Sequence, residues 1–153
     1  MFQSVCIDCD EIKLGDFSNW IFKDGADLSQ MFNNIGYNSN SILDLGTINL
    51  HSNDLSAMFS MTHGLKALIN FYDNPIDYIS LFHYAATRSG SEIIVNYTSD
   101  VTEIDNIIST KTSNSNIIKG ELSIIGPRPV VQDELEKYGE NKIAGEKFLE
   151  ENK

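Results

Sequence analysis

Two cysteines near the start of the chain form the pattern Cys6-Ile7-Asp8-Cys9. A C-x-x-C pair serves in proteins as a redox couple or as half of a metal site. Redox pairs open a helix after a core strand, whereas this pair lies inside a segment that alternates like a strand. Asp10 and Glu11 follow it, and their charges would raise the pKa of a neighbouring thiol. No second C-x-x-C follows in the sequence, so we expect free thiols, no metal site and no cofactor.

Other polar residues point to chemistry only weakly. Asp8, Asp10 and Glu11 could bind a cation, but they lack the spacing and the glycine of a calcium loop, so a solvated acidic face is the expected role. His83 and Arg88 lie near one predicted helix end without a partner acid or nucleophile. The sequence has no phosphate-binding glycine loop, zinc-protease motif or serine-nucleophile motif. An enzyme is therefore not predicted, and an unrecognised one stays an alternative. The three histidines are scattered, with none at ligand spacing from another: His51, His63 and His83.

The formal net charge of −11 at pH 7 is unevenly distributed along the 153 residues. Residues 1–110 carry four Lys or Arg against fourteen Asp or Glu, a net of −10, while residues 111–153 carry seven against eight, a net of −1. A negative surface repels phosphate backbones and anionic lipids, which disfavours direct binding to nucleic acid or membranes. It attracts basic protein surfaces, so a basic protein is the expected partner. The alternative is that acidity only keeps the protein soluble.

The residues expected to bind this partner lie near the N-terminus. Carboxylates would meet the partner's basic side chains, and an aromatic side chain would anchor the contact. Immunity proteins against nuclease toxins would fit, because such toxins carry Lys and Arg where phosphate docks, and phage inhibitors that imitate nucleic acid fit for the same reason. The alternative is that these are ordinary surface acids. The predicted partner-binding residues are Asp8, Asp10, Glu11, Asp16, Trp20, Phe22, Asp24 and Asp27.

A specific pattern occupies residues 116–140, NIIKGELSIIGPRPVVQDELEKYGE. Asn116 and Lys119-Gly120-Glu121-Leu122-Ser123 precede Gly126-Pro127-Arg128-Pro129, and Glu134 and Tyr138 follow. The segment resembles the C-terminal part of the catalytic core of bacterial sugar transferases, which move a sugar phosphate from a nucleotide sugar onto a polyprenyl phosphate. The resemblance covers roughly a sixth of the chain.

The catalytic residues of that family are not matched here. The resemblance implies an Asp-Glu pair followed by Leu-Pro-Gln shortly before Asn116, but Ser109-Thr110 and Lys111-Thr112-Ser113 stand at those positions. A hydroxyl without a neighbouring base is a poor nucleophile and cannot replace an anionic magnesium ligand. The family's membrane-inserting helix and basic motif are absent as well. We therefore expect no sugar transfer and interpret the tail as a relic of a transferase gene joined to an acidic domain.

The elements that would position these residues suggest an α+β fold. Strands are expected at 2–9, 42–50, 92–97 and 122–125, with a bulge at Gly46. Helices are expected at 28–35, 76–87, 101–108 and 131–151, and over a stripe of helical spacing from Leu55 to Tyr72. No internal repeat is evident. We predict a single small domain with a mixed or antiparallel sheet packed against two or three helices, followed by a C-terminal strand-turn-helix appendage.

The charge shift, the polar stretch 109–115 and the resemblance all begin near residue 110. This predicts an acidic α+β domain over 1–110 and a sugar-transferase-like tail over 111–153. The start of the chain lacks a basic region ahead of an apolar stretch, and no run of eighteen apolar residues exists, so a cytoplasmic location is expected. The predicted function is a small acidic binding protein that neutralises a basic partner. The alternative is a degenerate fragment or regulator of a polysaccharide-synthesis sugar transferase.

Overall fold

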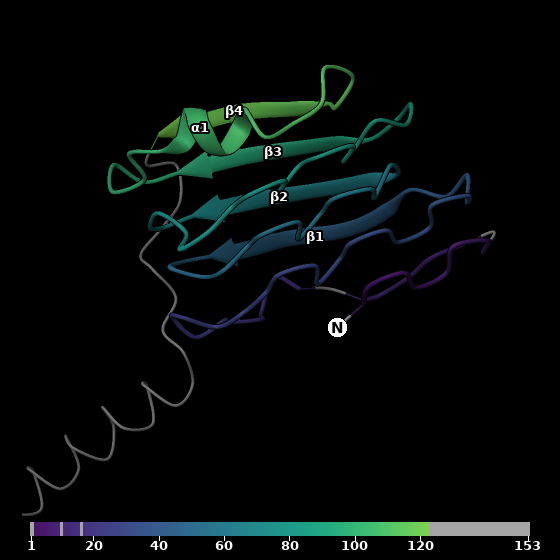
Figure 1. Ribbon diagram of the computed structural model, residues 1–153, viewed down its shortest axis with the longest axis horizontal. Coiled ribbons are helices and arrows are strands. Elements are labelled where there is room, and N and C mark those ends of the chain that lie inside the picture. Colours follow the sequence, from purple (N-terminus) through teal and green to yellow (C-terminus); the bar gives the residue numbers. More distant parts are fainter. Residues whose placement is uncertain (1, 10, 16, 123–153) are drawn as a thin grey trace, which may run out of the picture.

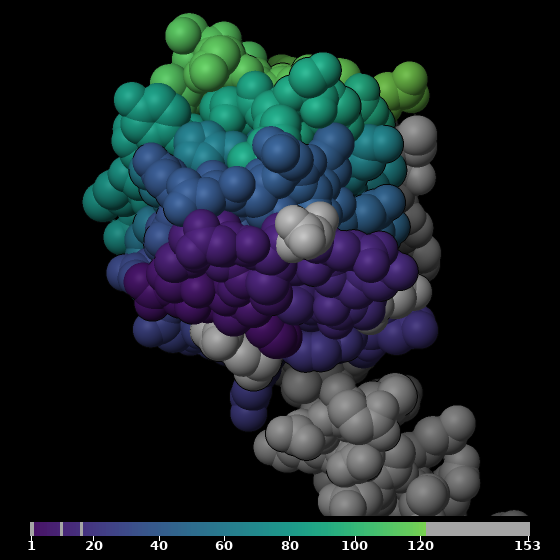
Figure 2. All heavy atoms as spheres, turned by 90° about the vertical axis from the view of Figure 1, so that its right-hand side faces the viewer, coloured from purple at the N-terminus to yellow at the C-terminus, as the bar shows by residue number. Residues whose placement is uncertain are grey.

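The computed structural model describes residues 2–9, 11–15 and 17–122, and its sheet is entirely parallel. Each strand pairs with the strand that follows it in sequence, so the chain winds as a β-solenoid whose coils stack on one another (Figure 1). Figure 2 shows the same stacking as bands of colour that succeed each other in sequence order. The regular elements are β1 (Leu43–Leu50), β2 (Leu65–Phe71), β3 (Glu92–Tyr97), α1 (Ile104–Ile108) and β4 (Ile117–Leu122).

The predicted α+β architecture is wrong. The sheet is neither mixed nor antiparallel, and the described residues contain one helix, the five-residue α1, rather than two or three helices packed on a sheet. Residues 2–8, expected to belong to a strand, form turns apart from Phe2. The expected helices at 28–35, 55–72 and 76–87 are absent. β2 occupies part of the range 55–72.

Two strands lie where the sequence places them. β3 matches the predicted range 92–97, and β1 begins one residue after the predicted start. In β1, Leu43, Leu45 and Ile48 are buried while Asp44 is exposed. Gly46 has a φ of 64°, and the pairing with β2 shifts register between Asp44 and Thr47, which confirms the predicted bulge.

The segments predicted as helices form irregular coils that bond to the next turn of the solenoid. Successive N–H groups donate across coils instead of along a helix: Ala57 N–H to the Ile79 carbonyl at 2.8 Å, and Phe32 N–H to the Met58 carbonyl at 2.9 Å. Single residues within these coils adopt positive φ, which a right-handed helix excludes. They are Gln30, Asn34, Ala57, Met61, Ser80, Tyr84 and Ala86.

A column of phenylalanine rings runs through the core from coil to coil. Phe32 and Phe59 stack with centroids 5.7 Å apart, and Phe59 and Phe82 stack at 6.0 Å. Phe2 extends the column by stacking on Phe32 at 5.6 Å. Aromatic pairs of this kind add about 0.5–1.5 kcal/mol each beyond the burial of their surface. The column therefore stabilises the stacking of successive coils.

The stacked coils reveal an internal repeat, so the expectation of none is wrong. Residues 27–32 read DLSQMF, residues 54–59 read DLSAMF, and residues 77–82 read DYISLF. Their first residues lie in register, because Asp27 forms a backbone bridge with Asp54, and Asp54 forms one with Asp77. Each repeat ends on one member of the phenylalanine column.

The polar stretch 109–115 contacts the preceding coil and leads directly into the sheet. The hydroxyls of Thr110 and Thr112 accept the N–H groups of Phe82 and Tyr84 at 3.2 and 2.7 Å. β4 follows at 117–122, ahead of the predicted strand at 122–125, and pairs with β3. The boundary at residue 110 stays a prediction, because residues 123–153, with the Gly126–Pro129 turn and the predicted charged helix, lie outside the described residues. Across the described residues, no helix has the length and apolar character needed to cross a membrane.

Candidate functional site

The turns that follow the carboxyl ends of the strands lie side by side along one edge of the solenoid, here called the carboxyl edge. The turn before the first repeat joins the same edge, because Gly25 N–H donates to the Ser52 carbonyl at 2.7 Å. On the far side, Glu103 N–H donates to the Asn74 side chain at 3.1 Å. The carboxyl edge comprises residues 23–27, 51–54, 72–77 and 98–103.

Negative charge is concentrated on the carboxyl edge. Its four turns contain one Lys or Arg, Lys23, and the parallel winding stacks their acids in a strip. The opposite turns, residues 36–42, 62–64, 86–91 and 111–116, carry Arg88 and Lys111 and no carboxylate. Charge is therefore distributed unevenly along the strand direction, with negative charge at the carboxyl edge and positive charge at the opposite turns. Its acids are Asp24, Asp27, Asp54, Asp73, Asp77, Asp100 and Glu103.

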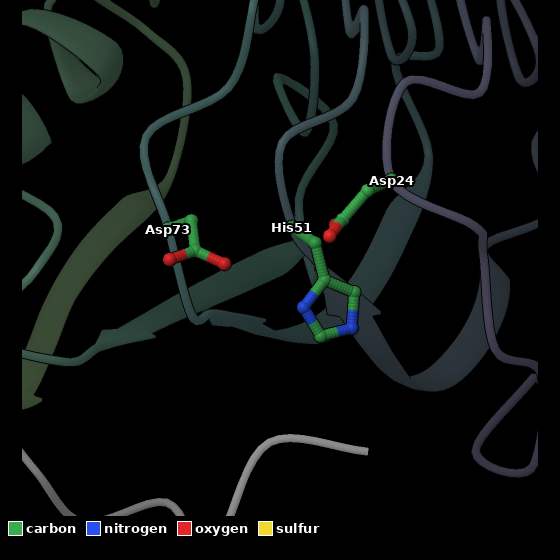
Figure 3. A group of neighbouring side chains, drawn as sticks. All are labelled: Asp24, His51 and Asp73. Atoms are coloured by element: carbon green, nitrogen blue, oxygen red, sulfur yellow. The ribbon is translucent and has the colours of Figure 1, made fainter. Parts of the chain in front are cut away.

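Three side chains from adjacent coils converge on the carboxyl edge. Asp24, His51 and Asp73 each offer one ligand atom, and these atoms all lie within 4.8 Å of one another. Figure 3 shows the two carboxylates on different sides of the imidazole ring. His51 is 1% exposed, Asp73 is half-buried and Asp24 is exposed. The group thus places a buried nitrogen base between two carboxylates near the surface.

Asn53 organises the turn that carries His51. Its side-chain oxygen accepts the His51 N–H at 3.1 Å, and its side-chain nitrogen donates to the Lys23 carbonyl at 2.7 Å. Its own carbonyl accepts the Ile76 N–H at 2.8 Å. Asn53 is fully buried, and its side-chain amide and backbone carbonyl together link the three coils that supply the cluster. The His51 ring also stacks on Tyr72, with centroids 5.2 Å apart.

The three repeat aspartates have a structural role within the carboxyl edge. Asp27 accepts the Ser29 N–H at 2.9 Å, Asp54 accepts the Ser56 N–H at 3.0 Å, and Asp77 accepts the Ile79 N–H at 2.9 Å. Aspartate favours such local turns because its short side chain reaches the backbone two residues on. Hydrogen bonding from Ser29 lowers the pKa of Asp27, so this carboxylate stays ionised.

The structure divides the predicted partner-binding residues among separate regions. Asp24 and Asp27 lie on the carboxyl edge. Asp8 lies towards the opposite edge, where it accepts a hydrogen bond from Asn38 at 2.9 Å. Glu11 is also away from the strip and pairs with Lys13 at 3.0 Å, with both side chains largely exposed.

The predicted aromatic anchors belong to the segment that precedes the first repeat. Trp20 is 38% exposed and packs against Phe17 at 4.7 Å, while Phe22 is half-buried and lies 6.2 Å from Trp20. Asp10 and Asp16 fall outside the described residues. The six predicted residues that the structure describes therefore do not gather in one place.

The remaining sequence candidates are placed apart. Cys6 and Cys9 are both half-buried. His83 is exposed, and Arg88 donates to the Ser41 carbonyl at 3.0 Å. His51 and Asp73 were not among the predicted site residues. The signal that could have located them is the repeat, because it fixes which turns become neighbours.

Comparison with known proteins finds only short local matches. A segment of 26 residues is 65% identical to an uncharacterised sugar transferase of Haemophilus influenzae, and covers 17% of this chain and 6% of that protein. Segments of 23 residues are 78% and 74% identical to the exopolysaccharide production proteins ExoY of Sinorhizobium fredii and Rhizobium meliloti. Each covers 15% of this chain and 10% of ExoY. No protein-family model and no solved structure matches the chain. The chain therefore carries a sugar-transferase-like segment.

Proposed function

We propose that the chain is a small acidic binding protein that docks its carboxyl edge onto a basic partner protein and masks the partner's functional surface. The observation that supports the proposal is the strip of seven carboxylates with one lysine among them. Charges held on stacked coils keep a fixed spacing, so they can face a fixed pattern of Lys and Arg. A nuclease toxin carries such a pattern where phosphate docks, which makes an immunity protein the best example.

Electrostatic docking of this kind has a recognisable salt dependence. Exposed charges are screened beyond about 10 Å at 0.1 M salt, so steering by the strip weakens as salt rises. Complementary charge raises the association rate more than it slows dissociation. Binding to the partner should therefore be fast at low salt and slow markedly at high salt.

The test uses two triple variants that remove the same number of charges. Asp27→Asn, Asp100→Asn and Glu103→Gln remove three of the seven negative charges of the carboxyl edge, and asparagine at position 27 can still accept the Ser29 N–H. Asp8→Asn, Asp44→Asn and Glu92→Gln neutralise exposed acids elsewhere. Each protein serves as bait, and a captured nuclease is then purified and assayed for DNA hydrolysis with and without the chain.

We expect the edge variant to lose at least about tenfold in association rate and in inhibition, and the control variant to change little. Equal effects of the two variants, or binding unchanged between low and high salt, would refute docking by the carboxyl edge. Capture of a protein whose activity the chain does not alter would refute the masking role.

A second candidate function rests on the sugar-transferase-like segment. The chain would then be a degenerate fragment or a regulator of a transferase in polysaccharide synthesis. The hydroxyls at the positions of the missing acid pair are engaged locally: Ser109 donates to the Asn106 carbonyl at 2.6 Å, and Thr110 donates to the Ile107 carbonyl at 2.8 Å. These bonds close α1, which fits a structural use of the two residues. Capture of a glycosyltransferase in place of a nuclease would favour this function.

A further inference from the structure

We propose that Asp24, His51 and Asp73 form a binding site for a divalent transition-metal cation of the Zn²⁺ type. The inference goes beyond partner docking, because the ion would bind the isolated chain. It starts from the winding of the solenoid, which brings one residue from each of three adjacent coils to the same point. Cross-coil bonds from Gly25 to Ser52 and from Tyr72 to Leu50, at 2.7 and 3.0 Å, hold the three turns in register.

The geometry suits a single ion. Zn²⁺ bonds nitrogen and oxygen ligands at about 2.0–2.2 Å, which places neighbouring ligand atoms roughly 3–3.5 Å apart. The three ligand atoms lie within 4.8 Å of one another, so rotation of the carboxylates would close the remaining gap. Asp24 is exposed and can turn toward the ring without repacking the core. The half-exposed setting leaves further coordination positions to water.

The imidazole is held in place by neighbouring residues. Its backbone is tied to Asn53, and its ring lies against Tyr72 at an interplanar angle of 24°. A ligand held in this way loses little freedom when it binds an ion. Asn53 also bonds to the Lys23 carbonyl, next to Asp24, so the same amide positions two of the three ligands.

The donor set selects the class of cation. Imidazole nitrogen favours zinc, copper, nickel and iron, whereas magnesium and calcium prefer sites made of oxygen alone. Two carboxylates and a neutral imidazole balance the charge of a divalent ion. A bound ion would also cancel two charges of the strip, leaving Asp27, Asp54, Asp77, Asp100 and Glu103 to face a partner.

The test titrates the full chain with ZnCl₂ by calorimetry after treatment with a chelator. Cys6→Ser and Cys9→Ser are introduced first, because the two thiols could otherwise bind zinc themselves. Asp24→Asn is the main variant, since its exposed position should leave folding intact, and Asp73→Asn and His51→Gln accompany it. Asp100→Asn is the matched control, an exposed carboxylate on the same edge outside the cluster. Co²⁺ absorption in the visible range reports coordination independently.

We expect one Zn²⁺ per chain, a rise in Tm with ZnCl₂ but not with MgCl₂, and at least about a tenfold loss of affinity in Asp24→Asn. Asp100→Asn should bind as the parent does. The proposal is overturned if no saturable zinc binding occurs, or if Asp24→Asn and Asp73→Asn bind as tightly as Asp100→Asn. The first result would leave the three residues as a structural cluster that binds no ion. Docking of the basic partner is measured in chelator, so the two proposals can fail separately.

Discussion

His51 and His63 lie at opposite ends of the strands, and the charges around them differ in sign. His51 lies with two carboxylates on the carboxyl edge. His63 lies near Arg88, its Nδ1 is 2.7 Å from the Thr87 hydroxyl, and its ring meets Tyr37 edge-on at 5.1 Å. Partial burial, and then the positive charge of Arg88, lower the pKa of His63. The fold therefore favours the neutral form of His63.

This lowered pKa predicts that His63 makes the protein less stable in mild acid. Because the folded state holds a proton at His63 less tightly than the unfolded state, the free energy of unfolding falls as the pH drops below about 6.5. Urea unfolding between pH 7.5 and 5.5 should show this loss, and His63→Gln should reduce its size. A His83→Gln variant, at an exposed histidine, also removes one imidazole and serves as the control. An unchanged pH dependence in His63→Gln would contradict the prediction.

At the residue scale, the sequence indicated that acidic residues would form the exposed surface, but it did not indicate which of them would lie next to one another. Asp24 and Asp27 were expected to face a partner and do lie on the acidic strip, but the strip's other members come from turns far along the chain. Asp73 approaches Asp24 only because β1 and β2 pair in one particular register. In the sequence, that register is indicated only by the repeats that begin at Asp27, Asp54 and Asp77.

At the scale of elements, the coil segments explain why a helix is the natural expectation from sequence. In 28–35 the buried residues are Leu28, Met31, Phe32 and Ile35, which is the spacing of an amphipathic helix. The coil, which is interrupted by positive φ at Gln30 and Asn34, shows the same burial spacing as a continuous helix. Periodicity alone therefore cannot separate the two. In β1, by contrast, buried Leu43 and Leu45 alternate with exposed Asp44 and Gly46, and this period of two indicates a strand.

Ala57 distinguishes the coil from a helix by the sign of a stability change. Its φ is 53°, a conformation that costs alanine energy and glycine almost none. Ala57→Gly should therefore raise the free energy of unfolding by roughly 0.5–1 kcal/mol, after allowing for the greater freedom of glycine in the unfolded chain. In a helix the same change would lower it by about 1 kcal/mol.

Urea denaturation measures this change, with Ala26→Gly as the comparison. Ala26 is not among the residues with positive φ, so glycine there should lower stability. Loss of stability in both variants would indicate that residues 55–62 do not form the coil described here.

The repeat is visible in the sequence once its unequal spacing is known. DLSQMF and DLSAMF begin 27 residues apart, while DYISLF begins 23 residues later and shares with DLSAMF only the first Asp and the last Phe, so that four of the six positions differ. The intervening turns absorb the difference, since coils of a solenoid need to match only where they stack. A search at one fixed period misses such a pattern, and this left the parallel sheet unpredicted.

At the scale of the whole molecule, a solenoid is held together by contacts between neighbouring coils. Its stability is approximately a sum of coil and interface contributions, so a terminal coil can be removed and its share measured. The acidic strip belongs to this scale too, because its seven carboxylates come from four turns and exist as a surface only when the coils stack. Docking by the strip should therefore be lost together with the fold.

Removal of the last coil, which contains β4, tests where the acidic domain ends. β4 pairs with β3, Ile93 N–H donates to the Asn116 carbonyl at 3.0 Å, and Ile117 is 6% exposed. A chain of residues 1–115 loses these contacts, and a chain of residues 1–122 keeps them. Burial of one isoleucine is worth about 1.5–3 kcal/mol. The free energy of unfolding of chain 1–115 should therefore be at least about 2 kcal/mol lower than that of chain 1–122.

Urea denaturation of the two truncated chains, with the full chain as reference, measures this difference. The shorter chain should also associate more readily, because removal of β4 exposes the edge of β3 with its unpaired backbone groups. Equal stability of 1–115 and 1–122 would instead support a domain boundary near residue 110, with β4 as part of an appended tail. A large difference would show that the sugar-transferase-like region supplies a strand that the solenoid needs.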